Sequence, residues 1–152
     1  MANPFPFVAG TVLEASQLNG IGEAWTSYTP VIKGGATTVT ATLTYAKYLQ
    51  VNKLVFVQVY AQVTSTGAAN GGISISLPTG LDLINDSGFS VVGNFFVTDL
   101  GTAFYHGAAV PGSATTMNGI SNAQGSVMGA ASPTMTLVSG DRVAMSICYE
   151  VA

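Results

Sequence analysis

Apolar and polar residues alternate along most of the chain after residue 28, with the period of two that β-strands show. Between residues 38 and 45, Val39, Ala41, Leu43 and Tyr45 alternate with threonines. The same alternation recurs at 54–63, 73–77 and 143–149. Because successive side chains of a strand point to opposite faces of a sheet, this pattern predicts half-buried antiparallel strands.

The strand predicted at 54–63 has two different faces. One face consists of four valines and an alanine, which is typical of a core. The other face is apolar at one end and polar at the other, and it carries Leu54, Phe56, Gln58, Tyr60 and Gln62. Aromatic residues are favoured in the centres of protein interfaces. We therefore expect Phe56 and Tyr60 to lie in an oligomer interface.

The predicted strands are separated by turns at nearly regular spacing. Glycine-containing clusters occur at 34–35, 70–72, 86–88, 111–112, 118–119 and 140–141. Further strand-like runs cover 89–98 and 102–110, and two or three weaker ones fall between 113 and 138. About eight to ten short strands with such turns predict an all-β protein, an antiparallel β-sandwich or jelly roll. The Ala-, Gly-, Ser- and Thr-rich stretch 107–133 is compatible with two small-residue strands packed on a neighbour or with a loop.

The first 27 residues follow a helical pattern instead. Thr11 and Glu14 have the spacing of a capping box, which satisfies free amides at a helix start. We predict a short helix over 12–18 and a looser turn after it. The large apolar residues of this lead are Leu13, Leu18, Ile21 and Trp25. A helix this short needs a partner to be stable, so the sequence predicts an anchor segment at 1–27 and a β-sandwich domain at 28–152.

The composition points to a body that is covered by other protein. Of the 152 residues, 48% are hydrophobic and only 7% are charged, against about 25% charged in an average soluble protein. Low charge removes one common protection of exposed strand edges. We therefore expect copies of the same chain to cover much of this surface.

Net charge and hydropathy exclude several classes of partner. The four basic residues are scattered and the formal net charge is −3, so clustered contacts to nucleic-acid phosphates are not expected. No apolar stretch reaches the roughly 20 residues of a membrane span. The first residues lack a basic and then apolar signal-peptide pattern. This fits a protein that leaves the cell by lysis, and equally a cytoplasmic one.

Candidate chemistry is sparse, and we expect no enzyme, cofactor or metal. His106 is the only histidine, and no G-x-S-x-G nucleophile motif accompanies it, so a surface or interface role is favoured over catalysis. Asp82 and Asp86 fall in a turn-like stretch that breaks the calcium-loop pattern of an EF-hand. Cys148 has no second cysteine to pair with and is interpreted as a small buried or interface residue.

Three blocks of the sequence resemble small virion structural proteins of tailed bacteriophages. The lead VAGTVLEASQLNGIGEAWTSYTPVI is similar to the anchors of tail-fibre and head-fibre proteins. The following YAKYLQVNKLVFVQVYAQV is similar to their next strand pair, and ISISLPTGL resembles one of their strand ends. Together the blocks cover about half of the chain. In those proteins the anchor commonly precedes a longer fibre shaft, whereas here it leads almost directly into the body.

The resemblance implies a compact jelly-roll knob of the trimeric C1q or tumour-necrosis-factor type. Such a knob would be attached to other virion proteins through Leu13, Leu18, Ile21 and Trp25, in a particle made in the host cytoplasm without a signal peptide. An alternative is a module at a tail tip that binds a host receptor or glycan. Its candidate receptor-facing residues are Asn70, Asp82, Asp86 and His106, because short polar loop residues suit adaptable hydrogen bonding. A capsid decoration or cement protein is a further alternative.

Overall fold

The computed structural model describes residues 25–65, 69–84, 90–121, 126–130 and 134–152, and within these ranges the protein is all-β, without a helix. The helix predicted at 12–18 lies outside the described residues, as do Leu13, Leu18, Ile21 and Asp86. The all-β class expected from the alternating pattern is therefore confirmed for the described part of the chain. Every pairing between named strands is antiparallel.

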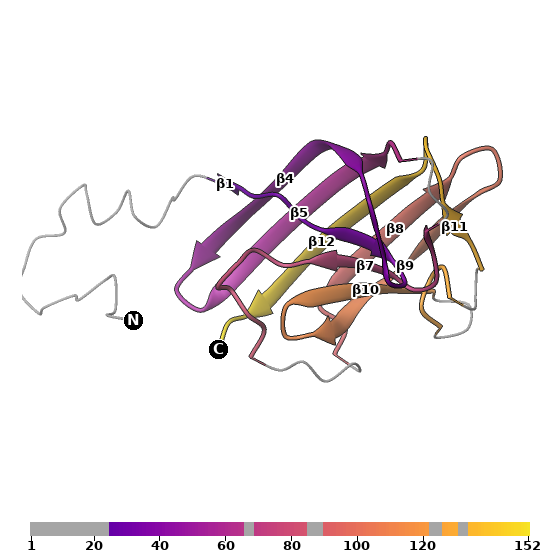
Figure 1. Ribbon diagram of the computed structural model, residues 1–152. Coiled ribbons are helices and arrows are strands. Elements are labelled where there is room, and N and C mark those ends of the chain that lie inside the picture. The colour runs from indigo at the N-terminus through magenta and orange to yellow at the C-terminus, as the bar shows by residue number, and fades with distance from the viewer. Residues whose placement is uncertain (1–24, 66–68, 85–89, 122–125, 131–133) are drawn as a thin grey trace, which may run out of the picture.

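Ten strands form one curled sheet, and two more form a small ribbon (Figure 1). The strands are β1 (Thr26–Ser27), β2 (Ile32–Gly34), β3 (Thr37–Val39), β4 (Ala41–Val51), β5 (Leu54–Val63), β6 (Ala69–Asn70), β7 (Ile73–Ser76), β8 (Gly93–Asp99), β9 (Ala103–Ser113), β10 (Thr116–Ser121), β11 (Thr136–Leu137) and β12 (Arg142–Glu150). The order in the large sheet is β1-β4-β5-β12-β8-β9-β10-β7-β2-β3, and β6 pairs with β11.

The sheet curls so that its two halves enclose one core. The long strands β4, β5, β12, β8 and β9 form one half, called the long wall here, and β10, β7, β2 and β3 form the short wall. The Tyr149 hydroxyl of β12 donates a hydrogen bond of 2.9 Å to the Leu81 carbonyl, and the Tyr28 hydroxyl donates one of 3.4 Å to the Ser76 carbonyl. Buried residues of both walls belong to a single hydrophobic cluster.

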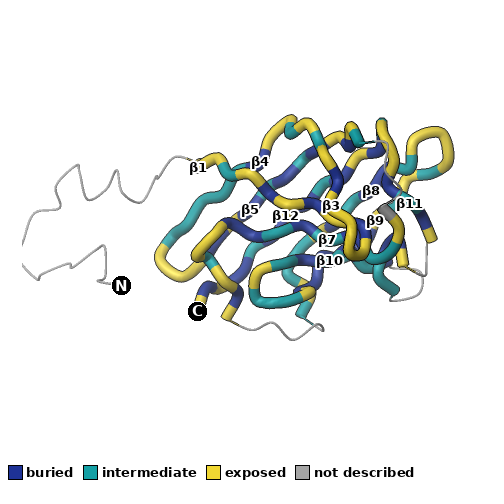
Figure 2. The backbone as a smooth tube through the Cα atoms, in the orientation of Figure 1, coloured by how far each residue is buried: buried dark blue, intermediate teal, exposed yellow. Residues whose placement is uncertain are grey.

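Alternation along the strands places one side of the long wall in this core. On β5 the side chains of Val55, Val57, Val59, Ala61 and Val63 are at most 1% exposed, and those that alternate with them are half-buried or exposed. Figure 2 shows the same change from residue to residue along β5 and β12. The short wall contributes Ile73, Ile75 and Met117, which are fully buried. Removing this apolar surface from water stabilises the fold by roughly 25 cal/mol per Å².

The strand expected at 38–45 differs from the prediction in one respect that matters for the surface. The chain forms β3 and then β4, and the pairing of β4 with β5 shifts register between Leu43 and Tyr45. Strict alternation would place Tyr45 on the core side together with Leu43. The β-bulge adds one residue to β4, so Tyr45 pairs with Tyr60 and is 44% exposed.

The stretch rich in small residues contributes a strand pair where the structure describes it. β9 continues to Ser113 and pairs with β10. A side chain at Gly119 would collide with the ring of Phe95, which is fully buried. The first of the two interpretations, small-residue strands packed closely on a neighbour, therefore holds for β9 and β10.

The segment from β1 to β2 joins the two ends of the curled sheet. β1 pairs with β4, and the Tyr28 amide donates a 3.0 Å hydrogen bond to the Ala46 carbonyl. Three residues later the Val31 amide donates to the Ser76 hydroxyl at 2.8 Å, and the Ser76 amide donates to the Val31 carbonyl at 2.9 Å. One short segment therefore bridges the long wall and the short wall.

Candidate functional site

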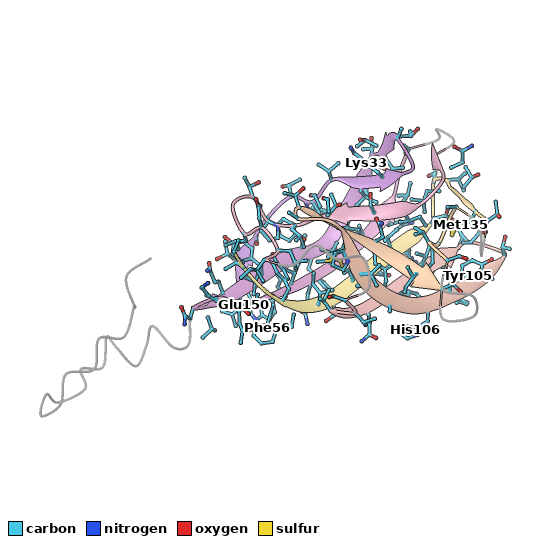
Figure 3. The ribbon with its side chains drawn as sticks, turned by 90° about the horizontal axis from the view of Figure 1, so that it is seen from below. Lys33, Phe56, Tyr105, His106, Met135 and Glu150 are labelled. Carbon is cyan, nitrogen blue, oxygen red and sulfur yellow. The ribbon has the colours of Figure 1, made fainter. Side chains whose placement is uncertain are left out.

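The side of the long wall that faces away from the core, called the outer face here, carries most of the unusual side chains. The strand registers arrange these side chains in rows across five strands. One row consists of Tyr45, Tyr60, Ala144, Phe96 and His106, on β4, β5, β12, β8 and β9 respectively. The adjacent row consists of Lys47, Gln58, Ser146, Asn94 and Ala108. In Figure 3, Phe56 and His106 lie along the lower border of the body, and Lys33 of β2 lies at its upper border.

Two aromatic pairs stand on either side of the small Ala144 side chain. The rings of Tyr45 and Tyr60 have centroids 5.9 Å apart and are tilted by 43°. The rings of Phe96 and Phe104 are 6.1 Å apart with an interplanar angle of 28°. Both separations are in the range of favourable aromatic contacts. Because β12 carries only alanine and serine between these pairs, the outer face is hollowed there.

This depression is called the aromatic hollow. It is lined by Tyr45, Gln58, Asn94, Phe96, Ala144 and Ser146, together with adjacent residues of β5 and β12. The lining residues named here carry no charge at neutral pH. The hollow thus combines aromatic surface with two amides and one hydroxyl.

The outer face becomes apolar toward the turn between β4 and β5. Phe56 pairs with Leu49 on one side and with Cys148 on the other, and Leu54 pairs with Glu150. The Ile84 amide donates to the Glu150 carbonyl, so Ile84 lies at the same end. Trp25, Leu54, Phe56 and Ile84 are all large, apolar and at least 40% exposed, and they define the apolar end. Exposed apolar groups gathered in this way mark a surface that binds a partner.

One cation separates the apolar end from the aromatic hollow. The Lys47 ammonium lies 5.0 Å from the centroid of the Trp25 ring and 5.5 Å from that of the Tyr45 ring. Cation–π contacts of this kind contribute roughly 0.5–1 kcal/mol at exposed sites. Lys47 therefore helps to hold Trp25, the first described residue, against β4.

The structure separates the predicted receptor-facing residues instead of gathering them. Asn70 pairs with Thr136 in the β6–β11 ribbon, whereas the Asp82 carbonyl accepts a hydrogen bond from the amide of Ala152 at the chain's end. β11 and the C-terminus lie at opposite ends of the body (Figure 1). His106 is exposed on β9, in the row of the outer face that also contains Phe96. These residues do not form one surface, and Asp86 lies outside the described residues.

The predicted anchor and interface residues lie on the outer face wherever they are described. Trp25 is 40% exposed beside Lys47. Phe56 belongs to the apolar end, and Tyr60 lies beside Tyr45 at the margin of the aromatic hollow. The sequence did not indicate the hollow itself. Tyr45, Phe96 and Ala144 come from strands that are distant in the chain, and only the register brings them together.

The buried carboxylate of Asp141 has a structural role. It is fully buried and accepts hydrogen bonds from the Leu100 amide at 2.9 Å and the Val138 amide at 2.8 Å. These two bonds fix the turn before β12 against the turn after β8. Among the described residues, no three His, Cys, Asp or Glu side chains gather in a way that could hold a metal ion.

Two buried tyrosines are the titratable groups most altered by the fold. Burial, more than the neighbouring Tyr149, raises the pKa of the Tyr28 phenol above its ordinary value of 10.0. Burial is also the largest cause of the raised pKa of Tyr149, followed by the charges of Asp82 and Tyr48. Both hydroxyls donate to backbone carbonyls inside the body, so their neutral forms belong to the folded state.

Comparisons with known proteins returned no match: no family model, no curated protein and no solved structure shows significant similarity to this chain. Within the described ranges, no helix has the length and apolar character required to cross a membrane.

Proposed function

We propose that this protein is a non-enzymatic structural protein of a tailed-bacteriophage virion. In this proposal it forms a homo-oligomeric knob, a trimer of jelly-roll or sandwich bodies, and its N-terminal segment attaches the knob to the particle. The resemblance of the lead and of the first strand pair to phage fibre proteins suggests the particle. The apolar end of the outer face is the observation that carries the homo-oligomer.

The apolar end has the properties of a contact between copies. Four large apolar side chains are exposed there, on a protein in which only 7% of all residues are charged. Soluble monomers rarely expose apolar residues in one contiguous group. A closed symmetric assembly would cover this end on every copy at once.

The position of the lead agrees with this arrangement. Trp25, where the described chain begins, lies beside Lys47 on the outer face and belongs to the apolar end. Residues 1–24 therefore join the body at the surface that we assign to the oligomer. Copies meeting at this end would bring their leads together, as a common attachment to the particle requires.

The first test is the solution mass of the full chain by light scattering, with a Leu54→Ser variant beside the wild type. A trimer has a mass of about 46 kDa, three times the 15.5 kDa of one chain. We expect that mass for the wild type and a lower mass for Leu54→Ser, because serine removes apolar contact area. Val31→Ser is the matched control, since Val31 is 45% exposed and precedes β2 of the short wall, while Leu54 is 48% exposed. A monomeric wild type would refute the homo-oligomer.

The second test separates attachment from folding. A chain without residues 1–24 retains β1 and all other described strands. We expect it to keep the β-sheet signal of the full chain in circular dichroism and to be missing from particles purified after expression during infection. Incorporation of the truncated chain at wild-type level would refute attachment through the lead.

A further inference from the structure

We propose that the aromatic hollow is a binding site for an uncharged saccharide. The proposal goes beyond the structural role given above, and it concerns the part of the outer face that lies on the far side of Lys47 from the apolar end.

The aromatic walls suit the apolar face of a sugar ring. Tyr45 is 44% exposed and belongs to the hollow together with Phe96, and Tyr60 and the small Ala144 lie between them in the register. Each of these two rings contacts a second ring, that of Tyr60 for Tyr45 and that of Phe104 for Phe96. A pyranose ring presents C–H groups on its faces, which pack on aromatic surface, and hydroxyls around its rim.

The hydrogen-bonding groups of the hollow are available to such a rim. Gln58, Ser146 and Asn94 occupy adjacent positions of one row, next to the row of Ala144. Within the part of the chain that the structure describes, none of these three side chains makes a hydrogen bond to the protein. Two amides and one hydroxyl offer both donors and acceptors, which is what sugar hydroxyls require.

The uncharged lining selects the class of ligand. The lining residues Tyr45, Gln58, Asn94, Phe96 and Ser146 carry no charge, so a charged ligand finds no ion pair within the lining itself. The Lys47 ammonium lies at its edge, 5.5 Å from the centroid of the Tyr45 ring. A purely apolar ligand, or the apolar surface of a second copy, would cover the amides without bonding to them. Burying an unsatisfied polar group costs roughly 1–3 kcal/mol. A neutral hydroxylated ring satisfies the amides and contacts the aromatic walls together.

The geometry that creates the hollow depends on the β-bulge in β4. Without the register shift between Leu43 and Tyr45, alternation would turn Tyr45 toward the core. β-bulges commonly redirect a side chain toward a binding site. The register shift in β4 therefore turns Tyr45 outward, where its ring supplies one wall of the hollow.

The test is a binding titration of the full-length chain by saturation-transfer NMR. The probes are neutral disaccharides of glucose, galactose, mannose and N-acetylglucosamine. We expect at least one probe to bind, and Tyr45→Ala and Asn94→Ala each to raise its Kd by about tenfold, as loss of one ligand contact does. Tyr45→Phe, which keeps the ring, is expected to bind nearly as well as the wild type. Val31→Ser, at a site before β2, is the control that leaves the Kd unchanged.

Three results would overturn the proposal. The wild type would bind no probe, or Tyr45→Ala and Asn94→Ala would bind as the wild type does, or both variants would lower the solution mass. The last result would assign the hollow to a second copy of the chain. Failure of the homo-oligomer would be recognised separately, from the mass of the wild type and of Leu54→Ser, because neither measurement involves a saccharide.

Discussion

The two faces of the long wall are built from the same strands but differ in what contacts them. On the inner face, Val55, Val57 and Val59 of β5 are covered by the short wall and are at most 1% exposed. On the outer face, Phe56 of the same strand is 40% exposed, and no described residue encloses it. The inner face uses branched aliphatic side chains that fill a closed space, whereas the outer face uses aromatic rings and amides that leave room for a ligand or another copy.

This difference shows how one strand can serve stability and binding at once. Because side chains alternate strictly along β5, substitutions on one face leave the packing of the other largely intact. The inner face determines whether the chain folds, and the outer face is free to vary in chemistry. The predictions below test that separation, beginning with the largest expected effect.

Phe95 and Phe96 are neighbours in β8 that point to opposite faces, so they provide the sharpest comparison. Phe95 is fully buried, and we expect Phe95→Ala to lower the free energy of unfolding by about 4 kcal/mol through cavity formation. Phe96 is half-buried in the wall of the hollow, and Phe96→Ala should cost less than about 1 kcal/mol. Urea unfolding of both variants measures the difference. Equal losses would show that the two faces are not independent.

Substitutions of Asp141 test whether the stability of this end of the long wall depends on a single buried side chain. We expect Asp141→Ala to destabilise the protein by about 2 kcal/mol, because it leaves the Leu100 and Val138 amides without their acceptor.

Asp141→Asn should recover part of this loss in the same urea experiment, since its one carbonyl oxygen can replace one of the two bonds. If Asp141→Ala unfolded at the wild-type urea concentration, the two turns would be fixed by other contacts.

Alkaline pH should destabilise the body through its inner tyrosines. A group whose pKa is raised by folding keeps its full contribution below the unfolded pKa and loses it as the pH rises further. For Tyr28 and Tyr149 that loss begins near the ordinary value of 10.0. We expect the Tm to fall by a few degrees between pH 9 and pH 11, in thermal melts at constant ionic strength.

The matched control for the alkaline effect is the double variant Tyr28→Phe with Tyr149→Phe, compared with Tyr45→Phe on the outer face. Removing the two inner phenols should flatten the alkaline slope, and removing the Tyr45 phenol should not. An unchanged slope in the double variant would assign the pH dependence to other groups.

Cys148 should give the smallest effect on stability. It pairs with Phe56 on the outer face and is half-buried, so Cys148→Ser is expected to change the free energy of unfolding by less than about 0.5 kcal/mol. Its thiol can still report on the interface. Alkylation of the wild type should be slow at concentrations that favour the oligomer and faster in Leu54→Ser, whereas equal rates would place Cys148 outside the contact between copies.

Local periodicity was sufficient to predict much of the fold. The alternation at 54–63 and 143–149 identified β5 and β12 and assigned the valines of β5 to the core, because the period of two is a property of the strand itself. The order of the strands is a property of distant segments. β12, from the end of the chain, lies between β5 and β8, and nothing within a short window of sequence specifies that insertion.

The aromatic hollow was unpredictable for the same reason, with one local complication. Tyr45 and Phe96 come from β4 and β8, which β5 and β12 separate in the sheet, and the small Ala144 and Ser146 of β12 leave space between them. The alternation that predicted β4 also assigned Tyr45 to the wrong face, since a β-bulge has no clear signature in a threonine-rich run. His106, a candidate receptor-facing residue on a predicted strand, lies exposed on β9 of the same outer face, at the end of the row that contains Phe96.

The bridge formed by the segment between β1 and β2 has a mechanical consequence. A load applied through the lead enters the sheet at β1, which is held by only two residue pairs, Thr26 with Tyr48 and Ser27 with Lys47. The hydrogen bonds of the Tyr28 and Val31 amides would then carry the load one after the other and break in that order. Releasing residues 26–31 lengthens the tether by roughly 20 Å at about 3.4 Å per residue. Ile32, the first core residue after them, is 2% exposed. Pulling it out would expose buried apolar surface, so the resistance to the load would increase at this residue. If the body were pulled through the residues that precede Trp25, it would therefore stretch before its core unfolds.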